Sequence, residues 1–192
     1  MVTVHDPRQR ELPPLLPLLA AADPARVVAW REGEAISAGH FLAEVRAVAA
    51  SLPHASAVVN LCEDRYAFLV AFCAVALRGQ TNLLPSSRAP QAVDEVMKAH
   101  PGCHALGDQP LDPAPPGYQQ LPPCDVHRPA RVDAPWPTLP ADQVVAIGYT
   151  SGSTGTPTPN LKSWGSFHAS NAGNLARLHA IVGERFELVA TV

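Results

Sequence analysis

The sequence predicts an α/β fold with a layered, mostly parallel sheet and helices on its faces. Short β-branched runs alternate with helical patterns from residue 26 onward, which is the order of strands joined by helical crossovers. The helical stretch 63–78 is apolar nearly all round, so we expect it to be covered on more than one side. Apolar residues make up 47% of the 192 residues, which is enough for an ordinary globular core.

Each predicted element has a local reason in the sequence. Ser37 is a candidate N-cap for a helix whose apolar residues repeat at helical spacing, and Pro53 ends that helix. Gly79 is placed as the C-cap of the apolar helix, and Pro101 ends the third helix. The expected strands span residues 26–30, 57–61, 81–84, 103–106, 143–150 and 187–192, and the expected helices span residues 38–52, 63–78, 90–100 and 167–182.

Residues 110–140 differ from the rest of the chain, because they hold ten of its 21 prolines and show little hydrophobic periodicity. This composition predicts an extended surface loop or linker, with Trp136 holding it to the body of the protein. We therefore divide the chain into an N-terminal segment (1–24), a first α/β subdomain (25–108), a proline-rich linker (109–140) and the start of a second α/β subdomain (141–192).

Charge and cysteine content exclude several classes of protein. A formal net charge of −3 gives no basic field, so nucleic acid is not an expected partner. The four cysteines form no CxxC pair and no metal-ligand spacing with the histidines, which favours reduced, mostly buried thiols in a cytoplasmic protein without a metal site. The leucine-rich residues 12–22 contain three prolines, which argues against a signal peptide, and residues 66–77 are too short to span a membrane.

The most informative segment is residues 149–157, which read Tyr-Thr-Ser-Gly-Ser-Thr-Gly-Thr-Pro directly after the apolar run 144–147. Glycine lets backbone N–H groups converge on an anion, and small hydroxyls add hydrogen-bond donors. A strand that ends in such a turn is a common way to bind phosphate. Neither the Walker A pattern nor the GxGxxG dinucleotide fingerprint is present, so this segment must be judged on its own pattern.

The segment closely resembles the phosphate loop of the acyl-adenylate-forming superfamily, which includes acyl-CoA synthetases, aryl-acid ligases and nonribosomal peptide adenylation domains. Residues 58–61 and 78–85 look like an early strand and turn of that family, so the resemblance covers about residues 25–192. It implies the N-terminal portion of an adenylating-enzyme large domain, with ATP and Mg²⁺ as cofactors and a carboxylic acid as substrate. It also implies CoA or an acyl carrier protein as the thiol acceptor. The residues implied to bind the ATP phosphates are Thr150, Ser151, Gly152, Ser153, Thr154 and Gly155.

Two departures from the family pattern bear on function. The family usually carries Pro-Lys-Gly after the loop, whereas Thr158 stands in the lysine's place here. Lys162 follows four residues later, and we hypothesise that it replaces the missing phosphate contact; the alternative is a surface lysine without a role. The stretch around Lys162 resembles a ligase branch associated with aryl-polyene pigment pathways. The family's adenine, ribose and catalytic-lysine motifs lie beyond residue 192, so the catalytic residues stay unknown and we expect a ligase fragment that does not complete adenylation alone.

Other functions stay open. A flavodoxin-like module also binds the phosphate of FMN with a Ser/Thr/Gly turn after a strand, although that turn normally follows the first strand. A fragment that binds no ATP would act only as an interaction domain. Because a partial α/β sheet exposes apolar edges, self-association is a further option.

The polar and aromatic residues near these motifs have structural interpretations. Asp64 begins the apolar helix and is expected to favour the helix dipole rather than take part in catalysis. Trp164 is expected to pack against its surroundings. The histidines that lack a partner at ligand spacing, or that are expected at the surface or at a helix cap, are His100, His104, His127 and His168.

Overall fold

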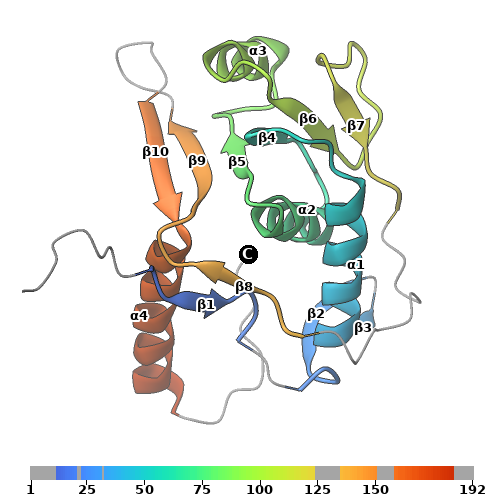
Figure 1. The fold of residues 1–192 in the computed structure, drawn as a ribbon. Helices are drawn as coiled ribbons and strands as arrows, with labels where there is room; N and C mark the ends of the chain where they lie inside the picture. The colour runs from blue at the N-terminus through green and yellow to red at the C-terminus, as the bar shows by residue number, and fades with distance from the viewer. Residues whose placement is uncertain (1–11, 21–22, 32, 124–134, 151–157, 184–192) are drawn as a thin grey trace, which may run out of the picture.

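A six-stranded sheet forms the centre of the computed structural model, which describes residues 12–20, 23–31, 33–123, 135–150 and 158–183 (Figure 1). Its strands are β4 (Ala57–Asn60), β5 (Thr81–Leu84), β6 (His104–Gly107), β7 (Tyr118–Gln120), β9 (Val144–Thr150) and β10 (Thr158–Ser163). They lie in the order β10-β9-β5-β4-β6-β7. All neighbouring pairs are parallel except β10 with β9, which is antiparallel. This mostly parallel sheet confirms the predicted α/β fold class.

Helices cover both faces of the sheet, as predicted. α1 (Ala38–Ser51) and α2 (Arg65–Leu77) pack on one face, and α3 (Pro90–Ala99) packs on the other. Alternate residues of β4 reflect this split, because Val58 belongs to the core with α1 and α2 whereas Val59 belongs to the core with α3. β5 and β6 flank β4 on opposite sides, so the crossovers through α2 and α3 run in opposite directions over opposite faces.

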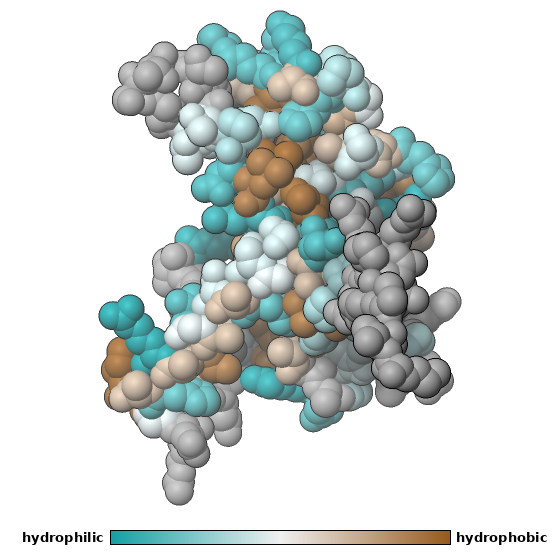
Figure 2. All heavy atoms as spheres, turned by 60° about the vertical axis from the view of Figure 1, so that its left-hand side comes forward, coloured by the Kyte–Doolittle hydropathy of each residue, from teal (hydrophilic) through white to brown (hydrophobic). Residues whose placement is uncertain are grey.

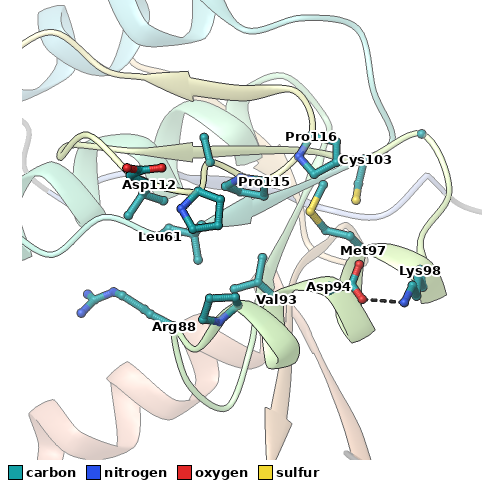
Figure 3. A pocket seen from close by; sticks show the side chains of 15 residues that line it. Leu61, Arg88, Val93, Asp94, Met97, Lys98, Cys103, Asp112, Pro115 and Pro116 are labelled. Carbon is teal, nitrogen blue, oxygen red and sulfur yellow. Dashed lines mark ion pairs between the residues drawn. The ribbon is translucent and has the colours of Figure 1, made fainter.

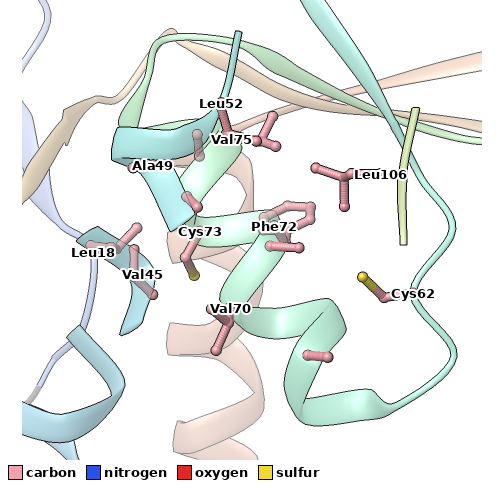
Figure 4. Close-up of a cluster of buried hydrophobic side chains, with 14 of the residues drawn as sticks. Leu18, Val45, Ala49, Leu52, Cys62, Val70, Phe72, Cys73, Val75 and Leu106 are labelled. Carbon is pink, nitrogen blue, oxygen red and sulfur yellow. The ribbon is translucent and has the colours of Figure 1, made fainter. Parts of the chain in front are cut away.

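α2 is apolar on nearly all sides and, as predicted, is covered on more than one of them. Nine of its 13 residues are buried, and the helix packs against α1, β4 and β5. The carboxylate of Asp64 caps its start by accepting a hydrogen bond from the backbone N–H of Ala67 at 2.8 Å. Gly79 follows its end with a φ of 71°, in the left-handed region that a helix C-terminus favours. The core with α1 and α2 is the larger of the two, and the core with α3 is the smaller. Figure 4 shows Phe72 and Cys73 of α2 within the larger core.

α1 and α3 begin at the residues that the sequence indicates. The hydroxyl of Ser37 accepts from the backbone N–H of His40 at 3.2 Å and caps α1, which ends before Pro53. Pro90 occupies the first turn of α3, where its missing N–H costs no helical hydrogen bond.

The proline-rich residues 110–140 are more structured than the predicted linker. β7 adds a parallel strand beside β6, and β8 (Thr138–Pro140) pairs antiparallel with β1 (Leu15–Pro17). Each of these strands has only three residues, so no periodicity in the sequence could reveal it. Trp136 packs against the larger core, as predicted. A further hairpin joins β2 (Val27–Arg31) and β3 (Glu34–Ser37) ahead of α1.

The last described residues hold β10, a strand that the sequence did not predict, and α4, a helix that begins earlier than predicted. α4 (Trp164–Val182) starts three residues before the predicted position, because the hydroxyl of Ser163 accepts from the backbone N–H of Ser166 at 3.2 Å. The predicted strand at 187–192 lies outside the described residues. The predicted domain boundaries stay a prediction, and β9 of the predicted second subdomain pairs with β5 in one sheet.

Candidate functional site

The parallel strands align their carboxyl ends along one edge of the sheet, where open α/β proteins commonly bind ligands. Gly148 of β9 lies opposite Leu84, the last residue of β5, so Tyr149 and Thr150 extend beyond the end of β5. Thr150, the first residue of the predicted phosphate-binding set, is exposed at this edge. The other loop residues of that set lie outside the described residues; they are Ser151, Gly152, Ser153, Thr154 and Gly155.

Lys162 lies toward the other end of the hairpin that β9 and β10 form. Thr158 pairs with Thr150, whereas Lys162 pairs with Ala146. At about 3.4 Å per residue, the Cα atom of Lys162 is about 14 Å along β10 from that of Thr158. The Lys162 side chain is exposed. The structure therefore brings Thr150 to the carboxyl edge of the sheet but not Lys162, whose phosphate contact stays a prediction.

Tyr149 attaches the end of β9 to α3. Its hydroxyl oxygen lies 2.5 Å from Nε2 of His100, the residue that caps the end of α3. Burial raises the pKa of the Tyr149 phenol, so the phenol keeps its proton at neutral pH. The phenol donates when Nε2 of His100 carries no proton and accepts when it does. His100 thus has a structural role, as expected, and that role is to hold the residue before Thr150.

Side-chain amides fix β9 against α2. Asn82 of β5 is fully buried, and its Nδ2 donates to the carbonyl oxygens of Val145 at 3.0 Å and Phe72 at 3.1 Å. Gln143, directly before β9, donates from Nε2 to the carbonyl oxygen of Ala76 at 2.7 Å. These side-chain hydrogen bonds join β5 and β9 to α2, so the strand that carries Thr150 has a defined position against the helix.

The N-terminus of α2 also opens at the carboxyl edge, but carboxylates already occupy its donors. Asp108, directly after β6, accepts from the backbone N–H groups of Glu63 and Asp64, each at 2.8 Å. Asp64 in turn accepts from Ala67. These carboxylates take the positions that an anionic ligand would occupy at a free helix N-terminus. Asp64 therefore caps the helix, in agreement with its predicted structural role.

Arg88 brings a positive charge to the same edge, and sequence reasoning missed it. Its Nη2 donates to the carbonyl oxygen of Cys62 at 2.5 Å. Cys62 follows β4 and Arg88 follows β5, so this bond joins the loops after two neighbouring strands, where the chain leaves toward opposite faces of the sheet. No motif in the sequence marks this arginine, because the contact depends on the tertiary fold.

The remaining predicted residues have structural contacts. Nε2 of His168 lies 2.9 Å from the carbonyl oxygen of Pro17, and the His168 ring meets the edge of Trp164, which packs against the larger core. His104 is buried in β6, where burial lowers its pKa, and His127 lies outside the described residues. Within the described ranges, no three His, Cys, Asp or Glu side chains gather as a metal site would require. None of the helices described here combines the length and apolar character needed to cross a bilayer.

Comparison with known proteins relates this geometry to solved structures. No protein-family model and no curated protein matches the sequence. The o-succinylbenzoate coenzyme A synthetase MenE from Bacillus subtilis, in complex with AMP, aligns over 81% of this chain with a TM-score of 0.63 and 18% identity. The N-terminal subdomain of NpsA from Klebsiella oxytoca aligns over 73% of the chain with a TM-score of 0.55 and 23% identity. This chain shares their fold.

The shared fold confirms the predicted layered α/β architecture, which matches part of the MenE and NpsA folds. The chain covers 43% of that MenE chain and 38% of that NpsA chain, so it spans less than half of either. MenE has also been solved with the acyl-adenylate intermediate OSB-AMP, and NpsA with 3-hydroxybenzoyl-AMSN.

Proposed function

We infer that this chain binds the phosphates of ATP as the N-terminal part of an ATP-dependent acyl- or aryl-acid adenylating ligase. The observation that carries this inference is the position of Thr150, which leads the Gly/Ser/Thr segment and is exposed at the carboxyl edge of the sheet. The fold shared with MenE, whose structure holds AMP, supports it. The residues proposed to donate hydrogen bonds to the phosphate oxygens are Thr150, Ser151, Gly152, Ser153, Thr154 and Gly155.

The described residues at this edge suit phosphate better than a metal ion. Thr150 offers an exposed hydroxyl, and Arg88 places a cation at the same edge. Asp64 and Asp108, two carboxylates at this edge, already accept backbone N–H groups. Mg²⁺ would therefore be held chiefly through the phosphates. Bound ATP would supply the adenylyl group, because a carboxylate that attacks its α-phosphate forms an acyl-AMP and pyrophosphate leaves.

The chain's own contribution is to hold phosphate donors in fixed positions. Tyr149 is fixed by His100, and β9 is fixed by Asn82, so Thr150 needs little rearrangement when a phosphate arrives. Lys162 remains a candidate phosphate ligand from its place in the sequence. Its position along β10 argues that Thr150 and the loop make the larger contribution.

The proposal extends to substrate, acceptor and location. The acid would be an acyl or aryl carboxylic acid, the acceptor CoA or an acyl carrier protein, and the compartment the cytoplasm. The loop variant favours the branch associated with aryl-polyene pathways. Because the chain spans less than half of the MenE and NpsA chains, we propose that it binds phosphate but does not release pyrophosphate alone.

ATP titration of residues 1–192 by calorimetry tests the phosphate site. We expect saturable binding that Thr150→Ala weakens at least about tenfold, since a hydrogen bond to a charged group contributes roughly 1.5–3 kcal/mol. Thr138→Ala is the matched control, because Thr138 is an exposed strand threonine of β8, away from the carboxyl edge. Lys162→Ala measures how much Lys162 contributes to the affinity for ATP.

Three results would overturn parts of this proposal. Wild-type protein that binds no ATP would contradict phosphate binding and favour an interaction domain. A flavin absorption spectrum in the purified protein would favour the FMN-binding module instead. Release of pyrophosphate from ATP and a carboxylic acid would contradict the assignment as an inactive portion of a ligase.

A further inference from the structure

A pocket of about 520 Å³ lies on the α3 face of the sheet, in the size range of small-molecule sites (Figure 3). Its walls come from Leu61 after β4, from one side of α3 and from the proline-rich residues 111–116. Thr150 does not line it. Arg88, which the proposed phosphate site also uses, does line it, so the two sites share this arginine, whereas the apolar part of the pocket has no role in phosphate binding.

The middle of the pocket is apolar. Leu61 and Val93 are buried members of the smaller core, and Met97 packs against that core beside them. Pro115 and Pro116 face these side chains from the opposite wall (Figure 3). A surface of this kind removes an apolar ligand group from water, and the methionine can adapt to its shape.

The proline-rich wall, residues 111–116, is attached to the sheet. The hydroxyl of Tyr118 donates to the carbonyl oxygen of Gln109, and the backbone N–H of Tyr118 donates to that of Pro115 at 3.1 Å. Gly107 leaves room for the Tyr118 ring, since a Cβ atom there would lie 2.5 Å from the tyrosine hydroxyl. The proline-rich wall is thus held by β6 and β7 rather than by a ligand.

The two ends of the pocket differ in their charges. At one end Lys98 and Asp94 form an ion pair at 2.5 Å, so their charges compensate each other. Arg88 and Asp112 lie at the other end (Figure 3), and neither takes part in an ion pair with any residue that the structure describes. Arg88 donates to the neutral carbonyl of Cys62, which orients the guanidinium but leaves its charge uncompensated.

We propose that this pocket binds a free α-amino acid with a large apolar side chain. The ligand carboxylate pairs with Arg88, the ammonium group pairs with Asp112, and the side chain lies against Leu61, Val93 and Met97. Arg88 and Asp112 are both exposed, so water solvates each charge in the free protein, and a ligand gains the attraction of both only if it carries both opposite charges. The zwitterion matches both charges and the apolar middle at once. This inference goes beyond the proposed function and does not depend on it.

Titration of residues 1–192 with L-phenylalanine, followed by calorimetry, tests the proposal. We expect saturable binding, and binding roughly two- to fivefold weaker for 3-phenylpropionate and for phenethylamine, each of which lacks one of the two charges, because pairs between exposed charges are weak. Absence of saturable phenylalanine binding would overturn the proposal. Equal binding of all three compounds would also overturn it, because the pocket would then recognise only the apolar group.

Variants that each remove one charge test which group of the ligand Arg88 and Asp112 bind. Arg88→Gln should weaken phenylalanine and 3-phenylpropionate but leave phenethylamine unchanged, and Asp112→Asn should show the reverse selectivity for the two analogues. Lys98→Gln is the matched control, because it removes a cation at the opposite end of the pocket. Circular dichroism checks that each variant is folded. If Lys98→Gln weakens phenylalanine as much as Arg88→Gln does, the assignment is wrong.

Discussion

α2 and α4 are both rich in apolar residues, yet one is the centre of the molecule and the other lies on its surface. Nine of the 13 residues of α2 are buried, whereas none of the 19 residues of α4 is. α2 packs against α1, β4 and β5, while α4 contacts β1, β8 and β10. The first turn of α4 reaches the larger core through Trp164 and Phe167, and its later residues Leu175, Ile181 and Val182 are exposed.

The difference shows that apolar content does not by itself decide burial in a partial α/β layer. α2 lies between a sheet and a second helix, so each of its sides finds a neighbour. Among the described residues, α4 reaches the larger core through Trp164 and Phe167 near its start, and Ile181 and Val182 near its end are 74% and 58% exposed. Exposed apolar surface of this kind is typical of contact sites.

The largest expected effect is a loss of stability on truncating α2. Phe72 is buried in the larger core, and its ring lies 6.0 Å from that of Phe68 and 5.9 Å from that of Phe167. Phe72→Ala should lower the free energy of unfolding by about 3–5 kcal/mol, since it removes apolar contacts and leaves a cavity. Urea denaturation followed by circular dichroism measures this change.

The matched substitution in α4 is Leu175→Ala, which removes a side chain that is 47% exposed. It should change the free energy of unfolding by no more than about 0.5 kcal/mol, as surface substitutions usually do. Similar losses for both variants would mean that α4 is covered in solution, and the contrast between the two helices would then be wrong.

The sequence predicts the buried half of this comparison better than the exposed half. α2 and β4 combine strong apolar patterns with clear caps, so their local signals agree with the tertiary structure. β10 escaped prediction because five of its six residues are exposed and one is Pro159. Its strand conformation depends on pairing with β9, and the local sequence of β10 does not predict that pairing.

The same distinction applies to the candidate site. Thr150 could be predicted, because a run of small residues after a strand is a local signal. The contacts of Arg88 with Cys62 and of Tyr149 with His100 could not, since they join residues 26 and 49 positions apart. Lys162 is a different case, because it is close to the loop in sequence but pairs with Ala146 toward the other end of the hairpin, and its phosphate contact stays a prediction.

A smaller effect is expected at the helix caps. Asp64→Ala removes the side-chain acceptor at the start of α2 and should lower the free energy of unfolding by about 1 kcal/mol. Ser163→Ala removes the corresponding acceptor of α4. Because α4 packs against few neighbours, we expect the loss of this capping acceptor to appear as faster amide hydrogen exchange within α4 rather than as a change in global stability. Equal shifts in urea midpoint would contradict this expectation.

The smallest effect on stability, and the sharpest test of the comparison, concerns the exposed apolar side of α4. The side chains of Leu175, Ile181 and Val182 follow one side of this helix. Figure 2, in which the side of the molecule with β10 and α4 comes forward, shows apolar residues among hydrophilic ones on this surface. The sequence leaves self-association open, and we expect any self-association of residues 1–192 to use this side, since covering it would remove apolar area from water.

The double variant Leu175→Lys/Ile181→Lys should keep its urea midpoint and sediment as a monomer at concentrations where the wild-type protein associates. Ala180→Lys is the control, because Ala180 is exposed on the other side of α4 and receives the same added charge. Sedimentation velocity over a range of concentrations measures the association. If wild type and double variant associate equally, another surface is responsible. If Ala180→Lys also yields a monomer, added charge rather than the apolar side of α4 is the cause.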